Sequence, residues 1–300
     1  MEEEITEVEH LSPFEKFEVV KRIRLFHPRA IDILNEISEL RRKAKYSKSP
    51  NSMIVTGDAG VGKSTIFEMY MERQEEKLNH SPIERMPILS SKIPKPASYF
   101  YLVNQLLSDL GANSELARSH AHKMQILLPH YIQTKGVEMI MLDEFQHFIN
   151  QEEQSILKNT ADWFKTLINA TNLPVVFFGT KDSMKVLTGN EQLGRRVRVR
   201  EELNTFAFHT NKSREEFKKL MFEFSKHLPF EESSEIQEDS MCARMYDASG
   251  GNISTINHLL AEATLYAAKQ GAQKIELAHL ARAFELDGFA SYGKQNPFQQ

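Results

Sequence analysis

The sequence has 300 residues, of which 41% are hydrophobic and 26% charged, and its formal net charge is −4. This composition is typical of a soluble globular protein, and the length allows one large or two modest domains. The negative net charge argues against a general nucleic-acid coat, because neutralising phosphates needs clustered Lys and Arg side chains. A local nucleic-acid site is still compatible with it.

Several other classes of protein are excluded by the same inspection. Cys242 is the single cysteine, so there is no intrachain disulfide framework and no zinc site built from cysteines. No apolar run approaches the roughly 18 residues that a membrane span needs. The acidic start, with five glutamates in residues 1–9, lacks the pattern of a signal peptide. We therefore expect a cytoplasmic protein without a membrane partner.

In chain order, an acidic extension over residues 1–27 precedes the first expected helix, Pro28–Tyr46, in which apolar residues recur at helical spacing. Basic residues gather at the end of this helix and just beyond it, at Arg41, Arg42, Lys43, Lys45 and Lys48. This basic cluster is either a solvated helix end or a binding surface.

The next segment carries the most specific motif of the chain. Met53–Val55 predicts a short buried strand, and Thr65–Leu78 predicts a helix. Between them lies the G-x-x-x-x-G-K-[ST] pattern, whose glycines let backbone N–H groups surround a phosphate at a helix N-terminus. Lys63 is expected to contact the β- and γ-phosphates of a nucleotide, and Ser64 to hold Mg²⁺. The expected nucleotide-binding residues are Gly57, Asp58, Ala59, Gly60, Val61, Gly62, Lys63, Ser64 and Thr65.

Strand and helix signals then alternate. Apolar runs without alternation predict three further strands, at Met86–Ser91, Glu138–Leu142 and Pro174–Gly179. Helices are expected between them, at Tyr99–Leu110, Ser119–Gln133 and Gln154–Ala170. This order predicts a three-layer α/β domain with a parallel sheet over residues 28–209.

After about residue 210 the strand signals stop. Four helices are expected over residues 210–290, at Ser213–His227, Ile236–Ala248, Asn252–Lys269 and Leu277–Leu286. They predict a C-terminal all-α domain, and the tail over residues 291–300 is expected to be disordered.

An apolar strand that ends in two carboxylates, Asp143 and Glu144, is a Walker B pattern. Asp143 is expected to bind Mg²⁺ through water, beside Ser64, and Glu144 to polarise the attacking water. A glutamate directly after the aspartate predicts hydrolysis of the nucleotide rather than binding alone.

Further catalytic candidates follow the strand Pro174–Gly179. Thr180 either hydrogen-bonds the attacking water or the γ-phosphate, or caps the turn before Asp182. Arg195 and Arg196 are expected at the edge of the domain, where an adjacent subunit can receive one of them as an arginine finger. For each arginine the alternative is a solvated basic face, and the sequence does not identify the finger.

Together these features resemble the AAA+ ATPases, in which a helical lid follows the P-loop core. Within that class, the segments TGDAGVGKST, LDEFQHF, FFGT, QLGRR and SGGNI resemble the TniB/TnsC transposition regulators over residues 28–285. The resemblance implies a bacterial, Mg²⁺-dependent ATPase that binds ATP or ADP and forms a homo-oligomer, ring or filament, on double-stranded DNA without sequence preference. It also implies that the oligomer marks the target site, recruits or stimulates the transposase, and works with a target-selection protein.

The expected lid departs from the wider AAA+ pattern. After Gly250 and Gly251 no arginine appears before Arg282, so the lid is expected to contact nucleotide through backbone, Asn252 or Ser254. This favours a slow ATPase. By the same resemblance, the basic segment 91–96 and the start of the next helix place lysines on DNA phosphates. The candidates are Lys92, Lys95 and Lys123, each of which is as readily explained as a solvated surface lysine. His120 and His122 are expected to bind no metal.

Two other functions stay open. A helicase loader or replication-initiator ATPase shares the fold but acts on single-stranded DNA with a helicase, rather than on duplex DNA with a transposase. A nucleotide-gated signalling switch binds no nucleic acid, and a nucleotide-dependent gel shift on duplex DNA distinguishes it.

Overall fold

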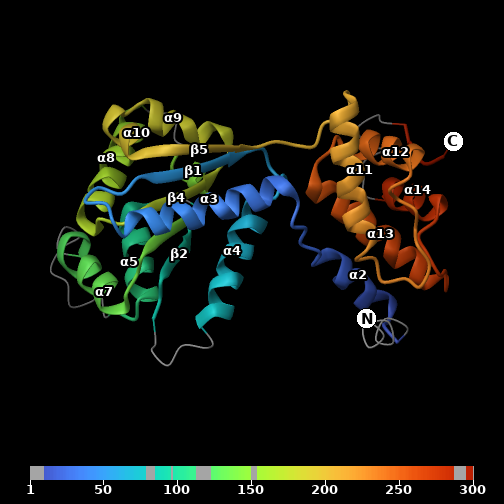
Figure 1. Cartoon of the computed structure of the whole chain (residues 1–300), viewed down its shortest axis with the longest axis horizontal. Coiled ribbons are helices and arrows are strands. Elements are labelled where there is room, and N and C mark those ends of the chain that lie inside the picture. Colours follow the sequence, from blue (N-terminus) through green and yellow to red (C-terminus); the bar gives the residue numbers. More distant parts are fainter. Residues whose placement is uncertain are drawn as a thin grey trace. The chain divides into compact units, whose positions relative to one another are not determined.

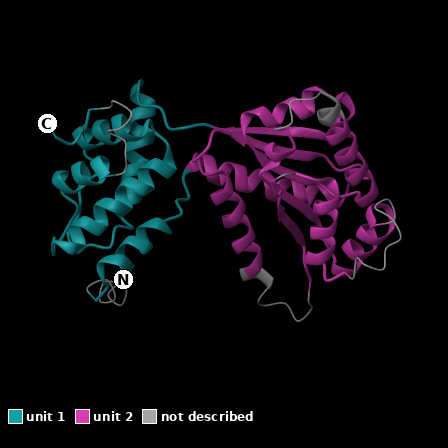
Figure 2. Ribbon diagram, turned by 180° about the vertical axis from the view of Figure 1, so that it is seen from behind, with its two compact units in different colours: residues 1–27, 204–300 teal, residues 28–203 magenta. Residues whose placement is uncertain are grey.

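The computed structural model describes residues 10–78, 85–95, 97–112, 123–149, 154–286 and 295–299. It contains two compact units, coloured separately in Figure 2. Residues 28–203 belong to an α/β unit, and the residues described within 1–27 and 204–300 belong to a helical unit. No helix in the described parts of the chain is long and apolar enough to cross a lipid bilayer.

The α/β unit is built on a five-stranded parallel sheet (Figure 1) with the strand order β2-β3-β4-β1-β5. Because the strands are parallel, their C-terminal ends share one edge of the sheet, where ligands of open α/β sheets bind. The prediction of a parallel sheet is confirmed. The strands are β1 (Ser52–Gly57), β2 (Ile88–Lys92), β3 (Met139–Asp143), β4 (Val175–Gly179) and β5 (Val197–Leu203).

Helices cover both faces of this sheet. Ile54 of β1 faces the core formed with α5, α7 and α8, whereas Met53 and Val55 face the core formed with α3 and α4. Successive strand residues therefore supply two cores, which explains the unbroken apolar runs. The longer helices are α3 (Pro28–Ala44), α4 (Lys63–Leu78), α5 (Tyr99–Asp109), α7 (Leu128–Lys135) and α8 (Gln154–Thr171). Shorter ones are the π-helix η2 (Lys123–Leu127), the 3₁₀ helices η3 (Phe145–Phe148) and η4 (Lys181–Ser183), α9 (Met184–Thr188) and α10 (Glu191–Arg196).

Strand β5 corrects the prediction that the sheet ends with Pro174–Gly179. It pairs in parallel with β1 and forms the edge of the sheet beside it. Its Val197 and Leu203 are buried, but Arg198 and Glu202 between them are exposed. A search for apolar runs finds strands that are covered on both faces, so it misses an edge strand whose charged residues face water.

The basic cluster at the end of α3 makes ion pairs within the α/β unit. Arg41 Nη2 lies 2.6 Å from Glu138 Oε2, and Lys45 Nζ lies 2.9 Å from Glu138 Oε1. Lys43 Nζ lies 3.4 Å from Glu39 Oε1, and Arg42 pairs with the other oxygen of the same carboxylate. Four of the five basic residues of the cluster thus share two carboxylates, which favours a structural role for those four.

The helical unit contains the four C-terminal helices and also part of the N-terminal segment. Helix α2 (Pro13–Lys21) starts with a capping box between Ser12 and Glu15. Val20 and Leu25 are buried in the core of this unit, so the segment after residue 10 is not a separate extension. The sequence shows that this segment carries apolar residues, but it does not show which part of the chain they pack against. The C-terminal helices are α11 (Asn211–Ser225), α12 (Asp239–Ser249), α13 (Ile253–Lys269) and α14 (Leu277–Leu286).

The described part of the C-terminal tail is packed, contrary to the expected disorder. Phe298 is 2% exposed and its ring lies 6.3 Å from that of Phe284. Asn296 Nδ2 donates a hydrogen bond to the Ala281 carbonyl oxygen at 2.9 Å. One large aromatic side chain thus anchors residues 295–299 to the helical core, which a polar flanking composition does not reveal.

Candidate nucleotide-binding site

The P-loop connects β1 to α4 at the C-terminal edge of the sheet. Gly60 and Gly62 have φ values of 77° and 100°, in the left-handed region that glycine adopts without steric cost. A Cβ atom on Gly57 would lie 2.2 Å from the Leu203 carbonyl oxygen of β5, so the adjacent strand leaves no room for a side chain at this position. Helix α4 begins at Lys63, which places Ser64 and Thr65 in its first turn. The loop therefore has the geometry of an anion site at a helix N-terminus.

The Lys63 side chain lies along the loop. Its Nζ donates hydrogen bonds to the carbonyl oxygens of Gly57 and Asp58, at 2.9 and 2.7 Å. Burial lowers the pKa of Lys63, and the negative charges of Asp143, Glu144 and Asp58 oppose that shift. The ammonium group thus contacts the loop and is close enough to Asp143 and Glu144 to be affected by their charges.

Asp143 ends β3 and is only 2% exposed. Its Oδ1 accepts a hydrogen bond from the Glu144 backbone N–H at 2.8 Å, whereas the buried Oδ2 has no hydrogen-bond partner in the described residues. Burial raises the pKa of Asp143, and hydrogen bonds from the Ser64 side chain and the Glu144 N–H oppose this. An unpartnered buried carboxylate oxygen beside a serine hydroxyl fits the oxygen ligands that Mg²⁺ prefers.

Glu144 follows in an uncommon conformation, with φ of 62°. Its carboxylate accepts a hydrogen bond from Gln146 Nε2. Gln146 Oε1 in turn accepts a hydrogen bond from the Thr180 backbone N–H at 3.1 Å. The structure therefore brings the ends of β3 and β4 together through one amide side chain.

Thr180 directly follows β4 at the same edge of the sheet. Its side chain makes no capping hydrogen bond to the following 3₁₀ helix, so the alternative role as a turn cap is not observed. The next residue, Lys181, pairs with Asp58 of the P-loop at 3.3 Å and with Glu202 of β5 at 3.0 Å. The sequence analysis did not single out Lys181, because an isolated lysine after a strand carries no pattern.

Arg195 and Arg196 end α10, immediately before β5. Ser52 at the start of β1 pairs with Val197, which places both arginines at the N-terminal edge of the sheet, opposite the P-loop. Arg196 Nη2 donates to Asn169 Oδ1 at 2.9 Å, and Nη1 donates to Ser49 Oγ. The Arg195 side chain is 70% exposed and pairs with the exposed Glu191. Among the contacts that the structure describes, the Arg195 side chain has one partner, the exposed Glu191, whereas the Arg196 side chain has two, Asn169 and Ser49.

Two of the three candidate DNA-binding lysines line one groove between the end of β2 and α5, and the third, Lys123, contacts a residue of its lining. Lys92 and Lys95 line this groove together with Tyr101 and Asn104, and we call it the basic groove. Lys123 Nζ donates to Asn104 Oδ1 at 2.8 Å and lies over the Phe100 ring. Lys92 also pairs with Glu68 of α4 at 3.6 Å and lies opposite Asp143 in the sheet register.

Tyr101 was missed by the sequence analysis, although its side chain is 61% exposed in the basic groove. The available signal was the run Tyr99-Phe100-Tyr101, which places aromatic residues on more than one face of a helix. His120 and His122 lie outside the described residues.

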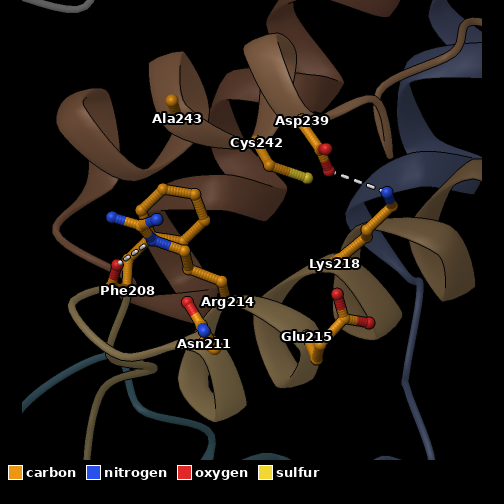
Figure 3. Close-up of a pocket in the computed structure, with 8 residues that line it drawn as sticks. All are labelled: Phe208, Asn211, Arg214, Glu215, Lys218, Asp239, Cys242 and Ala243. Carbon is orange, nitrogen blue, oxygen red and sulfur yellow. Dashed lines mark hydrogen bonds and ion pairs between the residues drawn. The ribbon is translucent and has the colours of Figure 1, made fainter.

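A different pocket lies in the helical unit, where Lys218, Asp239 and Cys242 are among the lining residues (Figure 3). Lys218 Nζ and Asp239 Oδ1 form an ion pair at 2.7 Å. Burial raises the pKa of the Cys242 thiol to about 11, so it stays protonated and weakly reactive at neutral pH. Asn252, also in this unit, caps α13 by accepting a hydrogen bond from the Thr255 N–H at 3.2 Å. Its contact with nucleotide stays a prediction.

The fold and the P-loop with its acidic pair together define an ATPase of the AAA+ class. The family model described as "Bacterial TniB protein" matches residues 17–206, and the chain belongs to the TniB family. This confirms the resemblance found from the sequence motifs. No curated protein matches the chain.

Solved structures with the same fold have low sequence identity to this chain. The ORC1 protein of Aeropyrum pernix in complex with DNA is 13% identical, with a TM-score of 0.65 over 90% of this chain and 69% of that chain. Cdc6p from Pyrobaculum aerophilum is 12% identical, with a TM-score of 0.64 over 89% and 69%. The ORC2 protein of Aeropyrum pernix, in ADPNP–ADP complexes, is 11% identical, with a TM-score of 0.61 over 89% and 71%. These similarities establish the fold.

Proposed function

We propose that this protein is an ATP-dependent regulator of DNA transposition. In this proposal it binds ATP and Mg²⁺, oligomerises on duplex DNA, selects the target site, recruits or stimulates the transposase, and hydrolyses ATP slowly. The observation that carries the proposal is that the nucleotide site and the basic groove meet at one sheet edge, where Lys92 lies opposite Asp143. Membership of the TniB family supports the link to transposition.

The residues of the site have distinct roles in this proposal. The P-loop N–H groups and Lys63 bind the phosphates. Ser64 and Asp143 hold Mg²⁺, which when bound neutralises charge on the β- and γ-phosphates. Glu144 accepts the proton of the attacking water, and Thr180 contacts that water or the γ-phosphate. Because Arg195 and Arg196 lie at the opposite edge of the sheet, a finger arginine acts on the site of an adjacent subunit.

The basic groove is proposed to bind DNA through the phosphate backbone. Lysine contacts to phosphates position a protein on the duplex but carry no sequence information. Burial raises the pKa of Asp143, and Lys92 lies close enough for its positive charge to oppose that rise. A change at Lys92 is therefore expected to alter the nucleotide site as well, so Lys95 and Lys123 give the cleaner test.

The variant Lys95→Ala with Lys123→Ala is expected to bind duplex DNA more weakly, with ATP affinity unchanged. Each lost phosphate contact reduces the salt slope of binding by about one unit, so the double variant loses about two. Fluorescence anisotropy with a labelled duplex, measured over a series of salt concentrations, gives both the affinity and the slope.

The matched control is Lys185→Ala, which removes a similarly exposed lysine that pairs with Asp182 on the same unit. Its DNA affinity and salt slope should equal those of the parent protein. An unchanged slope in the double variant would exclude the basic groove as the DNA site. Lys48, in the basic cluster after α3, would then be the next residue to replace.

The variant Arg195→Ala is expected to bind ATP normally and to lose assembly-dependent hydrolysis. An arginine finger contributes about 10³–10⁵ in rate in well-studied nucleotide hydrolases. ATPase rates measured over a range of protein concentrations, with and without duplex DNA, report this loss.

Mixing Arg195→Ala with Glu144→Gln subunits tests the action between subunits. An intact Glu144 site on the Arg195→Ala subunit then meets an intact Arg195 from its neighbour, so activity should return. Arg196→Ala is the matched arginine control and should keep assembly-dependent hydrolysis, because the Arg196 guanidinium already hydrogen-bonds Asn169 and Ser49 of its own subunit. Failure of the mixture to hydrolyse ATP would argue against a finger at Arg195.

The replication-initiator alternative retains support from the fold, because the ORC1 structure and that of Drosophila ORC are described as DNA complexes. Electron microscopy with duplex DNA and a slowly hydrolysed ATP analogue tests the proposed assembly. Rings or filaments on the duplex support the transposition regulator. Assembly on single-stranded DNA alone favours the helicase-loader alternative, and no nucleotide-dependent binding favours the signalling switch.

A further inference from the structure

The backbone at Glu144 is held by its immediate neighbours. Its φ of 62° places a residue with a Cβ atom in the left-handed region, which costs about 1 kcal/mol. The Glu144 N–H donates to Asp143 Oδ1 at 2.8 Å, and its carbonyl oxygen accepts from the His147 N–H at 3.0 Å. This turn starts the 3₁₀ helix η3 and directs the Gln146 side chain back towards Glu144.

The Gln146 amide connects a hydrogen-bond acceptor, the Glu144 carboxylate, to a hydrogen-bond donor, the Thr180 backbone N–H. A carboxylate can only accept a hydrogen bond and a backbone N–H can only donate one. Gln146 Nε2 therefore donates to Glu144 Oε2 while Oε1 accepts from the Thr180 N–H at 3.1 Å. The flipped amide would satisfy neither partner, so both contacts fix one orientation of the side chain.

His147 is the other neighbour of the Glu144 carboxylate. Its Nδ1 lies 2.7 Å from the Ile93 carbonyl oxygen, and its Nε2 lies 3.8 Å from Glu144 Oε2. The second distance is too long for a hydrogen bond. It is Gln146, rather than His147, that hydrogen-bonds the carboxylate.

From this geometry we infer that Gln146 is a positioning residue for ATP hydrolysis, which ties the Glu144 carboxylate to the end of β4. An unrestrained glutamate samples several rotamers, and a general base works only when its carboxylate faces the attacking water. The anchor at Thr180 follows the fully buried strand β4. The inference rests on the proposed role of Glu144 as the base.

The first test is Gln146→Met, which keeps the length of the side chain but removes both hydrogen bonds. The turnover number kcat is expected to fall between about tenfold and a hundredfold, as for other misplaced catalytic groups. The Kd for a fluorescent ATP analogue is expected to stay within about twofold, because the P-loop contacts are intact. Gln133→Met, on the exposed surface of α7, is the matched control and should change neither value.

A second variant, Gln146→Glu, keeps an acceptor for the Thr180 N–H but replaces the donor to Glu144 with a carboxylate. Its kcat is expected to fall at least as far as that of Gln146→Met. This variant separates the contact with Glu144 from the packing of η3, since it keeps the contact with β4. Thermal melting of both variants identifies any loss of folding. An unchanged or raised kcat in either folded variant would overturn the inference.

A double-mutant cycle with Glu144→Gln distinguishes a positioning role from a structural one. If Gln146 acts through Glu144, Gln146→Met causes no further loss of residual hydrolysis in the Glu144→Gln background. Equal losses in both backgrounds would show that Gln146 acts elsewhere and would overturn the inference. Parental hydrolysis by Glu144→Gln alone would instead refute the proposed base, so the two failures are separate results.

Discussion

Replacing Lys63 with alanine is expected to abolish ATP binding at micromolar nucleotide and, with it, nucleotide-dependent assembly. The Lys63 ammonium lies against the P-loop carbonyl oxygens of Gly57 and Asp58, where the phosphates are proposed to bind. Removing one partner of a desolvated charge pair costs about 2–5 kcal/mol, or about 30- to 4,000-fold in affinity. Titration with a fluorescent ATP analogue measures the affinity, and light scattering with duplex DNA measures assembly.

The matched control for this prediction is Lys165→Ala on α8. Lys165 is 30% exposed and pairs with Asp162 at 3.1 Å, on a helix that packs against the opposite face of the sheet from α4. It should bind ATP and assemble as the parent protein does. Parental ATP affinity in Lys63→Ala would contradict the assignment of the nucleotide site itself, and with it the proposed function.

The variant Glu144→Gln is expected to bind ATP with parental affinity and to hydrolyse it about 10²–10⁴ times more slowly. The amide keeps the shape of the side chain and can still accept the hydrogen bond from Gln146, but it cannot take a proton from water. ATP-bound complexes on duplex DNA should then persist longer than those of the parent protein. Single-turnover hydrolysis and the dissociation rate from a labelled duplex measure the two effects.

Glu223→Gln, which alters a surface ion pair with Lys226 in the helical unit, is the control and should leave both rates unchanged. Parental hydrolysis by Glu144→Gln would move the base to another residue. Slow hydrolysis without longer-lived DNA complexes would agree with Glu144 as the base. It would contradict the proposal that hydrolysis releases the protein from DNA.

The expected lifetime of the ATP-bound complexes on duplex DNA depends on how fast the protein hydrolyses ATP. A complex whose ATP is hydrolysed slowly remains assembled long enough for a transposase to engage the marked DNA. The lid sequence, with no arginine between Gly251 and Arg282, is consistent with slow hydrolysis. Comparing the hydrolysis rate of the parent protein with its dissociation rate from duplex DNA tests whether one limits the other.

The sequence by itself determined the features whose chemistry lies within one short segment. The P-loop is one strand, one glycine-rich turn and the first turn of a helix, so its residues are neighbours along the chain. Four strands, β1 to β4, are recognisable as apolar runs because helices cover both faces of this parallel sheet and bury most residues of these strands. Three of the five segments that carry the resemblance to the TniB family, TGDAGVGKST, LDEFQHF and FFGT, begin in these strands, and the family model confirms that resemblance.

The tertiary structure decided the features that depend on strand order and register. The sheet places Lys92 opposite Asp143, and the contact between Gln146 and Thr180 spans 34 positions in the sequence. Arg196 reaches Ser49, which is 147 positions away, and so differs from the exposed Arg195 beside it. The edge strand β5 and the packed segments at both ends of the chain belong to this group as well. Local sequence patterns indicate the helix or strand that a residue occupies. Which side chains come into contact depends on how the helices and strands pair, and this pairing is fixed only when the whole core packs.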